Sequence, residues 1–379
     1  LDFLAPLHPC AARYQAYAAM DVPKEKGEEF LRYLRQDGCV HPSVLLDGTR
    51  TGRPSCHDPN MFSVQTPEDC ESCHGKGCEA CDGYGTDPDS RRIRTCIEAP
   101  EDYVLVEVDE SQVEMRGMAV YCNEPVLVDA YVNRRDIHQE TIDFVFQVAG
   151  KTITRRYAKV GNFMIPYGGT DNTFAARLKI PQEEGKLIYG SIEGRYPQVN
   201  ATKRRMLQQA RQTGYTFNIW RGKMAQKRPL WDLDSQDGYK RRKAENGVFN
   251  TLIQGTYSGS IVLASHARLV DYILREKLDH LWRPVICIYD SIIGVMHKSI
   301  VPFATRMTMD VMTSWDIGRL PDGGVFPLEA DAKMGKNLGI AKKYKPPATL
   351  REALAESKAL GFLEARRDPR RGRQGLLTA

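Results

Sequence analysis

The alternation of apolar and polar residues predicts a small set of strands. Tyr103–Val108 is an apolar run of strand length whose pattern indicates burial on both faces. Pro284–Ile288 and Ile292–Met296 have the same character, and Tyr289–Ser291 between them predicts a tight turn. Gly324–Glu329 is the candidate for a last strand. Together they indicate a small antiparallel sheet with a helical block between its first strand and the others.

Helical periodicity dominates the rest of the pattern. Cys39–Leu46 predicts one short additional strand, and Trp220–Gly238 predicts a loop because it contains Pro, Gly and Asp. A long helical stretch contains Pro197, so we expect the helix to break there. The stretches with helical character are 28–34, 111–121, 137–146, 153–165, 183–212, 246–274 and 349–366. The predicted fold class is therefore α+β, with a large helical insertion in the sheet.

Length and composition indicate an ordinary globular protein. The 379 residues exceed what one hydrophobic core usually organises, so we expect two or three subdomains. Hydrophobic residues make up 42% of the chain and charged residues 27%. The chain has no apolar run long enough for a membrane span and no basic-then-apolar leader, so we expect no membrane partner.

The net charge of +5 is small, but the positive charge is concentrated in two blocks. Residues 195–243 contain thirteen Lys and Arg against three Asp and Glu, and residues 333–379 contain twelve against four. Blocks of this kind suit a nucleic-acid backbone, because binding releases counterions. A solvated surface that keeps the protein soluble explains either block equally well.

Four of the ten cysteines lie within the segment CESCHGKGCEACDGYG. A secreted disulfide scaffold would be shorter and would spread its cysteines more evenly, so we expect reduced thiols in a cytosol-like compartment. Cys70, Cys73, Cys78 and Cys81 offer four thiolates to one tetrahedral Zn²⁺, and such a closed shell favours a structural role. The alternatives are a disulfide pair, free thiols, or replacement of one ligand by His74 or Cys56.

Two aspartates follow predicted strands. Asp109 ends the first apolar strand, and Asp290 lies at the tip of the later hairpin. If these strands are neighbours, the two carboxylates converge and could hold a pair of Mg²⁺ ions, as in phosphoryl transfer. The alternative for each is an Asp that caps its own turn.

A third constellation lies on one predicted helix. Arg155, Lys159, Phe163 and Tyr167 recur every four residues and so share one face. Two cations followed by two aromatic rings could hold a triphosphate at one end and stack a base at the other. The stripe could equally be a core-facing aromatic edge with a solvated basic end.

Six segments in order resemble family A DNA polymerases, the bacterial DNA polymerase I group, and the match is collinear from about Tyr14 to Gly339. TGRPSCHDPNMFSVQTP is similar to TGRLSSxDPNLQNIP, and RRYAKVGNFMIPYG is similar to motif B, RRxxKxxNFxxxYG. SRRIRTCIEAPEDYVLVEVDESQVEMRGMA resembles the motif A region, and RRDIHQETIDFVF resembles the DIH segment of the fingers. NTLIQGTYSG resembles NxxxQGTAAD, and IYDS stands where motif C has VHDE. The cysteine segment resembles, over sixteen residues, that of DnaJ-type chaperones.

The resemblance implies a role for each matching residue. Asp109, Asp290 and the carbonyl of Glu110 would bind two Mg²⁺ ions. The residues expected to contact the incoming dNTP are Glu110, Gln112, Glu114, His138, Arg155, Lys159, Phe163 and Tyr167. Those expected to contact the DNA primer–template are Arg53, Asn60, Asn250, Gln254 and Tyr289. Glu114 would be the steric gate that excludes ribonucleotides, although Ser111 and Glu114 also form a capping-box pattern.

The resemblance also implies a polymerase right-hand fold in which the thumb is largely absent from this chain. The expected parts are a thumb–palm remnant (1–40), palm (41–130, with a zinc-knuckle insertion at 68–89), fingers (131–249), palm (250–340) and a basic helical extension (341–379). A thumb or exonuclease segment, or other replication proteins, are possible partners. The cytoplasm of a bacterial or phage-infected cell is the expected location, with an organellar matrix as the alternative.

Several positions depart from the family pattern and keep other functions open. Tyr289 and Ser291 replace the His and Glu of motif C, and a Ser after the Asp is what single-subunit RNA polymerases carry. Pro54, Pro166, Asn246, Tyr257 and Ser258 also differ from the usual residues. The first alternative to a DNA polymerase is therefore an RNA polymerase-like or ribonucleotide-tolerant enzyme. The second is a nucleic-acid-binding module without catalysis.

Overall fold

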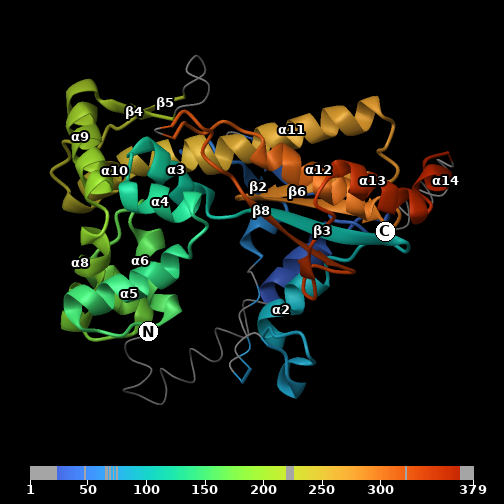
Figure 1. Cartoon of the computed structure of the whole chain (residues 1–379), viewed down its shortest axis with the longest axis horizontal. Coiled ribbons are helices and arrows are strands. Elements are labelled where there is room, and N and C mark those ends of the chain that lie inside the picture. Colours follow the sequence, from blue (N-terminus) through green and yellow to red (C-terminus); the bar gives the residue numbers. More distant parts are fainter. Residues whose placement is uncertain are drawn as a thin grey trace.

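The computed structural model describes residues 24–367, except 47, 65–66, 68–69, 71, 74–75, 219–225 and 321. Its centre is a five-stranded antiparallel sheet in the order β6-β7-β3-β8-β9 (Figure 1). The strands are β3 (Tyr103–Glu110), β6 (Trp282–Ile288), β7 (Ser291–His297), β8 (Ala330–Gly335) and β9 (Lys342–Tyr344). The predicted α+β class is thus confirmed, and so is the hairpin formed by β6 and β7.

Strand β3 lies in the middle of the sheet and sets its register. It pairs with β7 on one side and with β8 on the other, which places Asp109 opposite both Ser291 and Asp331. Because successive side chains of a strand point to opposite faces, the eight residues of β3 contribute to two separate cores. Val106 and Val108 belong to one core, and Tyr103 and Leu105 belong to the other.

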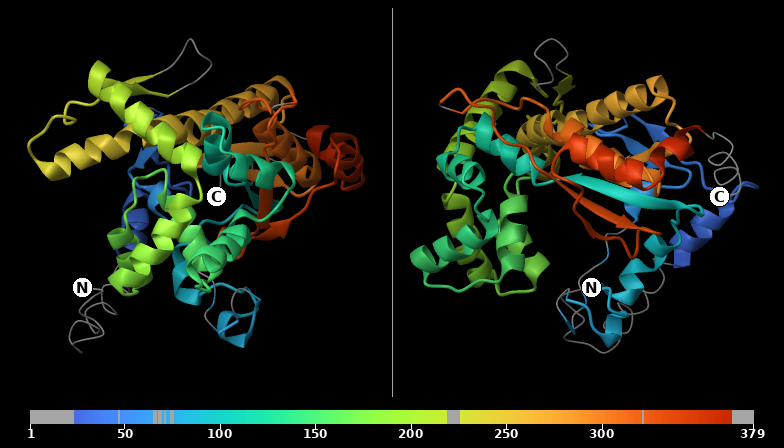
Figure 2. Two further views of the ribbon diagram at one scale, coloured as in Figure 1. Left: turned by 60° about the vertical axis from the view of Figure 1, so that its left-hand side comes forward. Right: turned by 45° about the vertical axis from the view of Figure 1, so that its right-hand side comes forward.

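Helices cover one face of the sheet. Helices α11 (Ser260–Arg275) and α12 (Val301–Thr313) contact the strands directly, and α13 (Leu350–Ala359) lies against α12. Helix α14 (Phe362–Arg367), the last among the described residues, contributes Phe362 to the same core. Strand β9 pairs with β8 at the edge of the sheet and α13 packs on α12, so residues 342–359 are part of the sheet and of the helices that cover it (Figure 2).

The opposite face is covered by the segment before β3. Two short strands, β1 (Ser43–Leu45) and β2 (Ser55–His57), form a hairpin, and the 3₁₀ turn η1 (Met61–Ser63) follows it. The cysteine segment includes a second 3₁₀ turn, η2 (Glu79–Cys81), and leads into helix α2 (Pro88–Thr95). In Figure 1 the segment with α2 lies below the sheet, away from α11 and α12.

The remaining helices form a lobe beside the sheet, which we call the helical lobe. Its buried residues form one continuous core that extends from Val113 to Ile261 and includes Phe326. The elements are α3 (Val113–Tyr121), α4 (Pro125–Val132), α5 (Ile137–Ala149), α6 (Arg155–Met164), α7 (Asp171–Leu178), α8 (Gln182–Gly194), α9 (Pro197–Thr213), β4 (Tyr215–Phe217), β5 (Lys227–Pro229) and α10 (Gly238–Ile253). None of the helices among the described residues is long and apolar enough to cross a membrane.

Local sequence signals account for most helix ends. Asp136 caps α5 by accepting from the backbone N–H groups of His138 and Gln139. Pro197 occupies the first turn of α9, where its missing N–H costs nothing, so the predicted break near this residue is confirmed. Gly214 ends α9 with a φ of 76°, a conformation that favours glycine.

One predicted strand is wrong. Gly324–Glu329 forms no strand, apart from a single bridge between Arg319 and Val325, and the chain enters the sheet only at β8. The sequence of β8, ADAKMG, is polar at the residues whose side chains are exposed, Asp331 and Lys333. A strand near the edge of a sheet with one wet face lacks the apolar run that identified β3.

The helical stretch predicted at 246–274 is confirmed, but it contains a π-helical turn, η3 (Gln254–Gly259), between α10 and α11. Such turns are rare and often occur at functional sites. The ring of Tyr257 in this turn lies against Gly117 of α3, where an added Cβ would be 2.2 Å from the ring. Tyr257 can be buried here only because residue 117 has no side chain.

We expect Gly117→Ala to lower the free energy of unfolding by about 1–3 kcal/mol through overpacking, as measured by urea unfolding. In a Tyr257→Ala background the same substitution should cost much less, because the ring is gone. Gly190→Ala is the matched control, since its Cβ would meet nothing within 4 Å and helix propensity alone should stabilise it by about 0.5–1 kcal/mol. Equal costs in both backgrounds would contradict the contact.

Candidate active site and cysteine cluster

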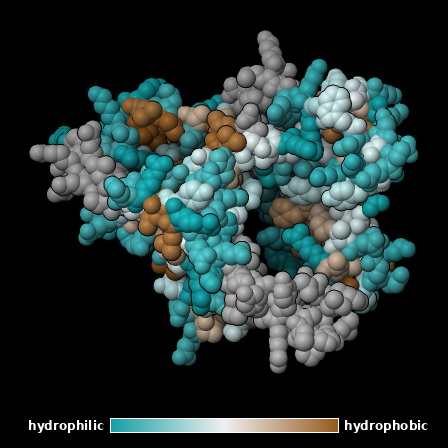
Figure 3. Space-filling model, turned by 180° about the vertical axis from the view of Figure 1, so that it is seen from behind, coloured by the Kyte–Doolittle hydropathy of each residue, from teal (hydrophilic) through white to brown (hydrophobic). Residues whose placement is uncertain are grey.

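Two carboxylates meet at one end of the sheet, as the sequence predicts. Asp109 lies next to the last residue of β3, and Asp290 lies in the turn between β6 and β7. The backbone N–H of Glu110 donates to the carbonyl of Asp290 at 3.0 Å and ties the two segments together. Seen from behind, the molecule is hollowed between the sheet and the helical lobe (Figure 3).

Burial and mutual repulsion disfavour the ionised form of the carboxyl groups at this end of the sheet. Burial and the neighbouring Asp290 raise the pKa of Asp109 to about 8. Burial also raises the pKa of Asp290 and, together with both aspartates, that of Glu110. In the part of the chain that the structure describes, neither Asp109 nor Asp290 forms an ion pair, and neither carboxylate oxygen of Glu110 has a hydrogen-bond partner. Hard divalent cations bind oxygen ligands of this kind, so the site fits Mg²⁺.

A second group links three separate parts of the chain around Glu114. One oxygen of its carboxylate accepts from Arg53 at 2.5 Å, and the other accepts from the hydroxyl of Tyr167. Arg53 also donates to the hydroxyl of Ser258 in the π-helical turn, and its guanidinium lies 5.5 Å from the ring centroid of Tyr289. Arg53, Glu114, Tyr167 and Tyr289 therefore form one cluster beside Asp290.

A third group centres on His138, which is 2% exposed. Its imidazole lies 3.1 Å from the amide nitrogen of Asn162 and 3.4 Å from that of Gln112, and its ring centroid is 6.0 Å from that of Phe163. Burial and the nearby charge of Arg155 lower the pKa of His138 to about 4, so the ring is neutral near pH 7. Gln112 has a φ of 57° and accepts from Tyr131.

The remaining predicted residues are placed as follows. Arg155 forms an exposed ion pair with Asp136, and Lys159, one turn further along α6, is exposed. Asn60 uses its side chain to cap η1, and the Oδ1 atom of Asn250 is buried without a partner among the described atoms. Gln254 begins the π-helical turn and hydrogen-bonds Tyr167.

Sequence reasoning missed three neighbours of these groups. Asp331 lies opposite Asp109 in the register and accepts from the hydroxyl of Ser111 at 3.2 Å. The hydroxyl of Tyr131 donates to Gln112. The hydroxyl of Ser258 accepts from Arg53. The alternation of ADAKMG could have revealed Asp331, whereas the other two depend on tertiary packing.

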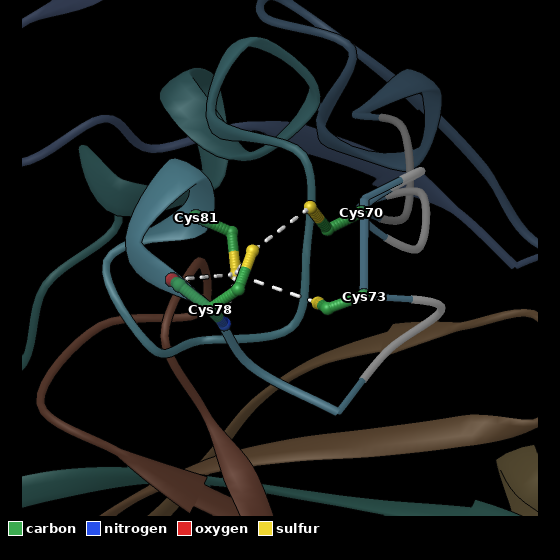
Figure 4. Close-up of side chains that lie close together, drawn as sticks. All are labelled: Cys70, Cys73, Cys78 and Cys81. Carbon is green, nitrogen blue, oxygen red and sulfur yellow. Dashed lines mark hydrogen bonds between the residues drawn. The ribbon is translucent and has the colours of Figure 1, made fainter.

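The four cysteines of the predicted knuckle converge (Figure 4). Their Sγ atoms all lie within 4.8 Å of one another, and three of the separations are 3.8, 3.8 and 3.7 Å. Four sulfurs about 2.3 Å from a tetrahedral Zn²⁺ would be about 3.8 Å apart, whereas a disulfide needs about 2.0 Å. The cluster therefore has the dimensions of a metal site.

Backbone amides complete the surroundings of the sulfurs. Gly77 donates to Cys73, and Cys78 and Gly85 both donate to Cys81, each at 3.2 Å. Although burial acts to raise it, these two N–H groups lower the pKa of Cys81 to about 6, which favours the thiolate that a metal needs. Cys56 belongs to the hydrophobic core and not to the cluster, and His74 lies outside the described residues.

An antiparallel sheet with paired acidic residues at one end, helices on one face and a helical lobe defines a polymerase of the right-hand class. The chain aligns with the polymerase domain of Pol1 from M. smegmatis, solved with DNA primer–template and dNTP, with a TM-score of 0.67 and 24% identity over 83% of this chain and 50% of that one. The family described as DNA polymerase family A matches residues 1–340. The chain belongs to DNA polymerase family A.

Two bacterial DNA polymerases show how much of a longer protein the chain matches. The thermostable DNA polymerase I of Thermus aquaticus is 25% identical over 345 residues, which are 89% of this chain and 37% of that protein. The DNA polymerase I of Treponema pallidum is 29% identical over 269 residues, which are 70% of this chain and 25% of that protein. The chain thus spans well under half the length of these relatives.

The buried His138 generates a pH prediction. The unfolded chain binds a proton at this residue near pH 6.5, whereas the folded chain does so only near pH 4. The free energy of unfolding should therefore fall as the pH drops through this window, by up to about 3 kcal/mol from this residue. Urea unfolding at several pH values should show a shallower fall for His138→Gln, with exposed His57→Gln as the control for loss of a histidine. Identical slopes for wild type and His138→Gln would refute a neutral buried imidazole.

Proposed function

We propose that this chain carries the catalytic centre of a template-directed DNA polymerase, which adds dNTPs to a primer 3′-OH by two-metal-ion nucleotidyl transfer. The single observation that carries the proposal is the pair of half-buried carboxylates, Asp109 and Asp290, which form no ion pair among the described residues and whose pKa values are raised. The cluster of Arg53, Glu114 and Tyr167 beside them supports a substrate with a sugar and a base.

The proposed mechanism assigns a task to each group. Asp109, Asp290 and the carbonyl of Glu110 would hold two Mg²⁺ ions, which stabilise the attacking and leaving oxygens of an in-line displacement. Arg155 and Lys159 are exposed on α6 and would bind the triphosphate. Arg155 would exchange the carboxylate of Asp136 for phosphate, which is a suitable acceptor for a guanidinium.

The neutral groups and the aromatic residues would position the nucleotide. His138, whose Nδ1 atom is held by Asn162, would donate from Nε2 to phosphate once Gln112 moves away from that nitrogen, without adding charge. Phe163 would face the sugar, and Glu114 would exclude a 2′-OH. On the DNA side Arg53 and Gln254 would read the minor-groove acceptors that every correct terminal base pair presents, while Asn60, Asn250 and Tyr289 would contact the strands.

The domain assignment follows from these roles. The sheet layer with α11 and α12, together with α3 and most of α4, would be the palm (41–130 and 250–340), and the rest of the helical lobe, within 131–249, would be the fingers. Residues 1–40 would adjoin a thumb, and 341–379 would extend the palm. A thumb or exonuclease segment or other replication proteins would be partners in the cytoplasm of a bacterial or phage-infected cell.

A ribonucleotide-tolerant or RNA polymerase-like enzyme is the second candidate, because Ser291 stands where the family has an acid. Its hydroxyl donates to the carbonyl of Ile288 at 3.0 Å and closes the turn that holds Asp290. The ion pair of Glu114 with Arg53 favours a DNA polymerase, since it fixes a carboxylate where a sugar gate is needed. A binding module without catalysis would have no use for this constellation.

We expect Mg²⁺-dependent primer extension with dNTPs and little with rNTPs. Asp109→Asn should reduce extension by at least about a thousandfold because one metal ligand is lost. Asp310→Asn is the control, since this residue lies on α12 and pairs with Arg306 away from the site. Glu114→Ala should raise the use of rNTPs relative to dNTPs. A wild-type chain that binds primer–template without extending it would exclude the enzyme, and efficient rNTP use by wild type would favour the second candidate.

We also propose that Cys70, Cys73, Cys78 and Cys81 bind one structural Zn²⁺. Purified protein should contain one zinc per chain, measured by atomic absorption. Cys81→Ser should lose the metal, whereas Cys96→Ser, an exposed cysteine outside the cluster, should retain it. Zinc in Cys81→Ser at the wild-type level, or a disulfide among these residues, would contradict the site.

A further inference from the structure

The cysteine cluster is joined to helix α2 by one buried arginine. The side chain of Arg91 is 8% exposed and donates to the carbonyl of Cys81 at 2.9 Å, to that of Thr86 at 3.2 Å and to the carboxylate of Asp82 at 2.6 Å. Its guanidinium also lies 4.7 Å from the ring centroid of Tyr84. The loop that ends the cluster therefore closes around a side chain of α2.

The same helix reaches the catalytic strand through a second buried arginine. Arg94, one turn after Arg91, pairs with Glu107 of β3 at 3.6 Å, and the two side chains are 6% and 10% exposed. Glu107 precedes Asp109 by two residues, so the alternation of the strand places both on the same face. Separating the two partners of a buried ion pair would leave an uncompensated charge, which is costly. The pair therefore holds α2 and β3 in a fixed relative position.

The rest of the connection consists of apolar packing and backbone hydrogen bonds. Ile97 and Ala99, which follow α2, pack in the core that contains Tyr103 and Leu105 of β3. The segment after α2 is hydrogen-bonded to the β8–β9 turn, from Leu338 to the carbonyl of Ile97 and from Ala99 to the carbonyl of Lys336. Lys342 of β9 lies 5.3 Å from the ring centroid of Tyr84. Among the described residues, Arg94 and Glu107 form the ion pair that joins α2 itself to the strand that carries Asp109.

We propose that the metal-bound cysteine cluster positions Asp109 through Arg91, Arg94 and Glu107, so that occupancy of the cysteine site and divalent-cation binding at the carboxylate site are coupled. This inference rests on the proposed functions of both metal sites. Arg94 and Glu107 are then positioning residues that touch neither metal nor substrate. The cluster would fix the placement of α2, and α2 would fix the end of β3.

The test measures binding without DNA, nucleotide or catalysis. Zinc-loaded and zinc-free protein are titrated with Mn²⁺, and free Mn²⁺ is followed by electron paramagnetic resonance. Thiolates are poor ligands for Mn²⁺, so the cysteine site should contribute little. The Mn²⁺ binding that is lost in the Asp109→Asn variant is the part that belongs to the carboxylate site. We expect removal of zinc to weaken Mn²⁺ binding by at least about fivefold. Because the coupling of binding free energies is reciprocal, Mn²⁺ should raise the affinity for zinc by a comparable factor, measured by equilibrium competition with a zinc-selective chelator.

Variants then locate the connection. In Arg94→Met/Glu107→Leu, which replaces the buried pair by apolar side chains, the affinity for Mn²⁺ should no longer depend on zinc. Arg94→Lys should retain most of the dependence. The matched control is Arg92→Met/Asp89→Leu, which removes an ion pair of 2.8 Å on the same helix whose side chains are 72% and 74% exposed, and it should behave as wild type.

Two results would overturn the proposal. Equal Mn²⁺ affinity of zinc-loaded and zinc-free wild type would show that the sites are independent, and an undiminished dependence in Arg94→Met/Glu107→Leu would show that this pair does not connect them. A chain with no bound zinc, or with no Mn²⁺ site sensitive to Asp109→Asn, would overturn the proposed metal sites themselves. Zinc stoichiometry and the Asp109→Asn titration separate these cases.

Discussion

Strand β3 carries negative charge into the centre of the molecule, and the elements around it hold that charge in place. The strand is paired on both sides, with β7 and β8, and its end therefore cannot move away from Asp290 or Asp331. Two adjacent carboxylates in a half-buried position repel each other and lose hydration. Pairing and packing along the whole of β3 offset this cost and hold the two carboxylates together.

The acidic residues near this strand fall into two groups according to whether an arginine compensates them. Glu107 is paired with Arg94, and Glu114 is paired with Arg53, so their charges are fixed and neutralised within the protein. Asp109 and Asp290 have no such partner among the described residues. Placement of the arginines thus concentrates the unbalanced charge at one point, which is the arrangement that a divalent-cation site requires.

Local signals in the sequence are sufficient to predict the two strands of the hairpin, the cysteine cluster and the position of Asp109 at the end of a strand. The cluster was predictable because its ligands lie within twelve residues, and β3 was predictable because burial on both faces produces an apolar run. Strand β8 was not, since one of its faces is wet and its residues alternate. Pairs such as Arg53 with Glu114, 61 residues apart, depend on how the sheet and helical lobe meet, which no local pattern encodes.

The charge near Asp109 also explains why residue 291 of motif C can be a serine. A carboxylate at residue 291 would face Asp109 directly across the β3–β7 ladder, because the two residues are Cα partners. Ser291 instead closes the turn through its hydrogen bond to Ile288. The carboxylates of Asp109 and Asp290 remain at this end of the sheet even though the motif has lost an acid. Since cation binding depends on the summed charge and on oxygen ligands, this departure is compatible with the chemistry of the family.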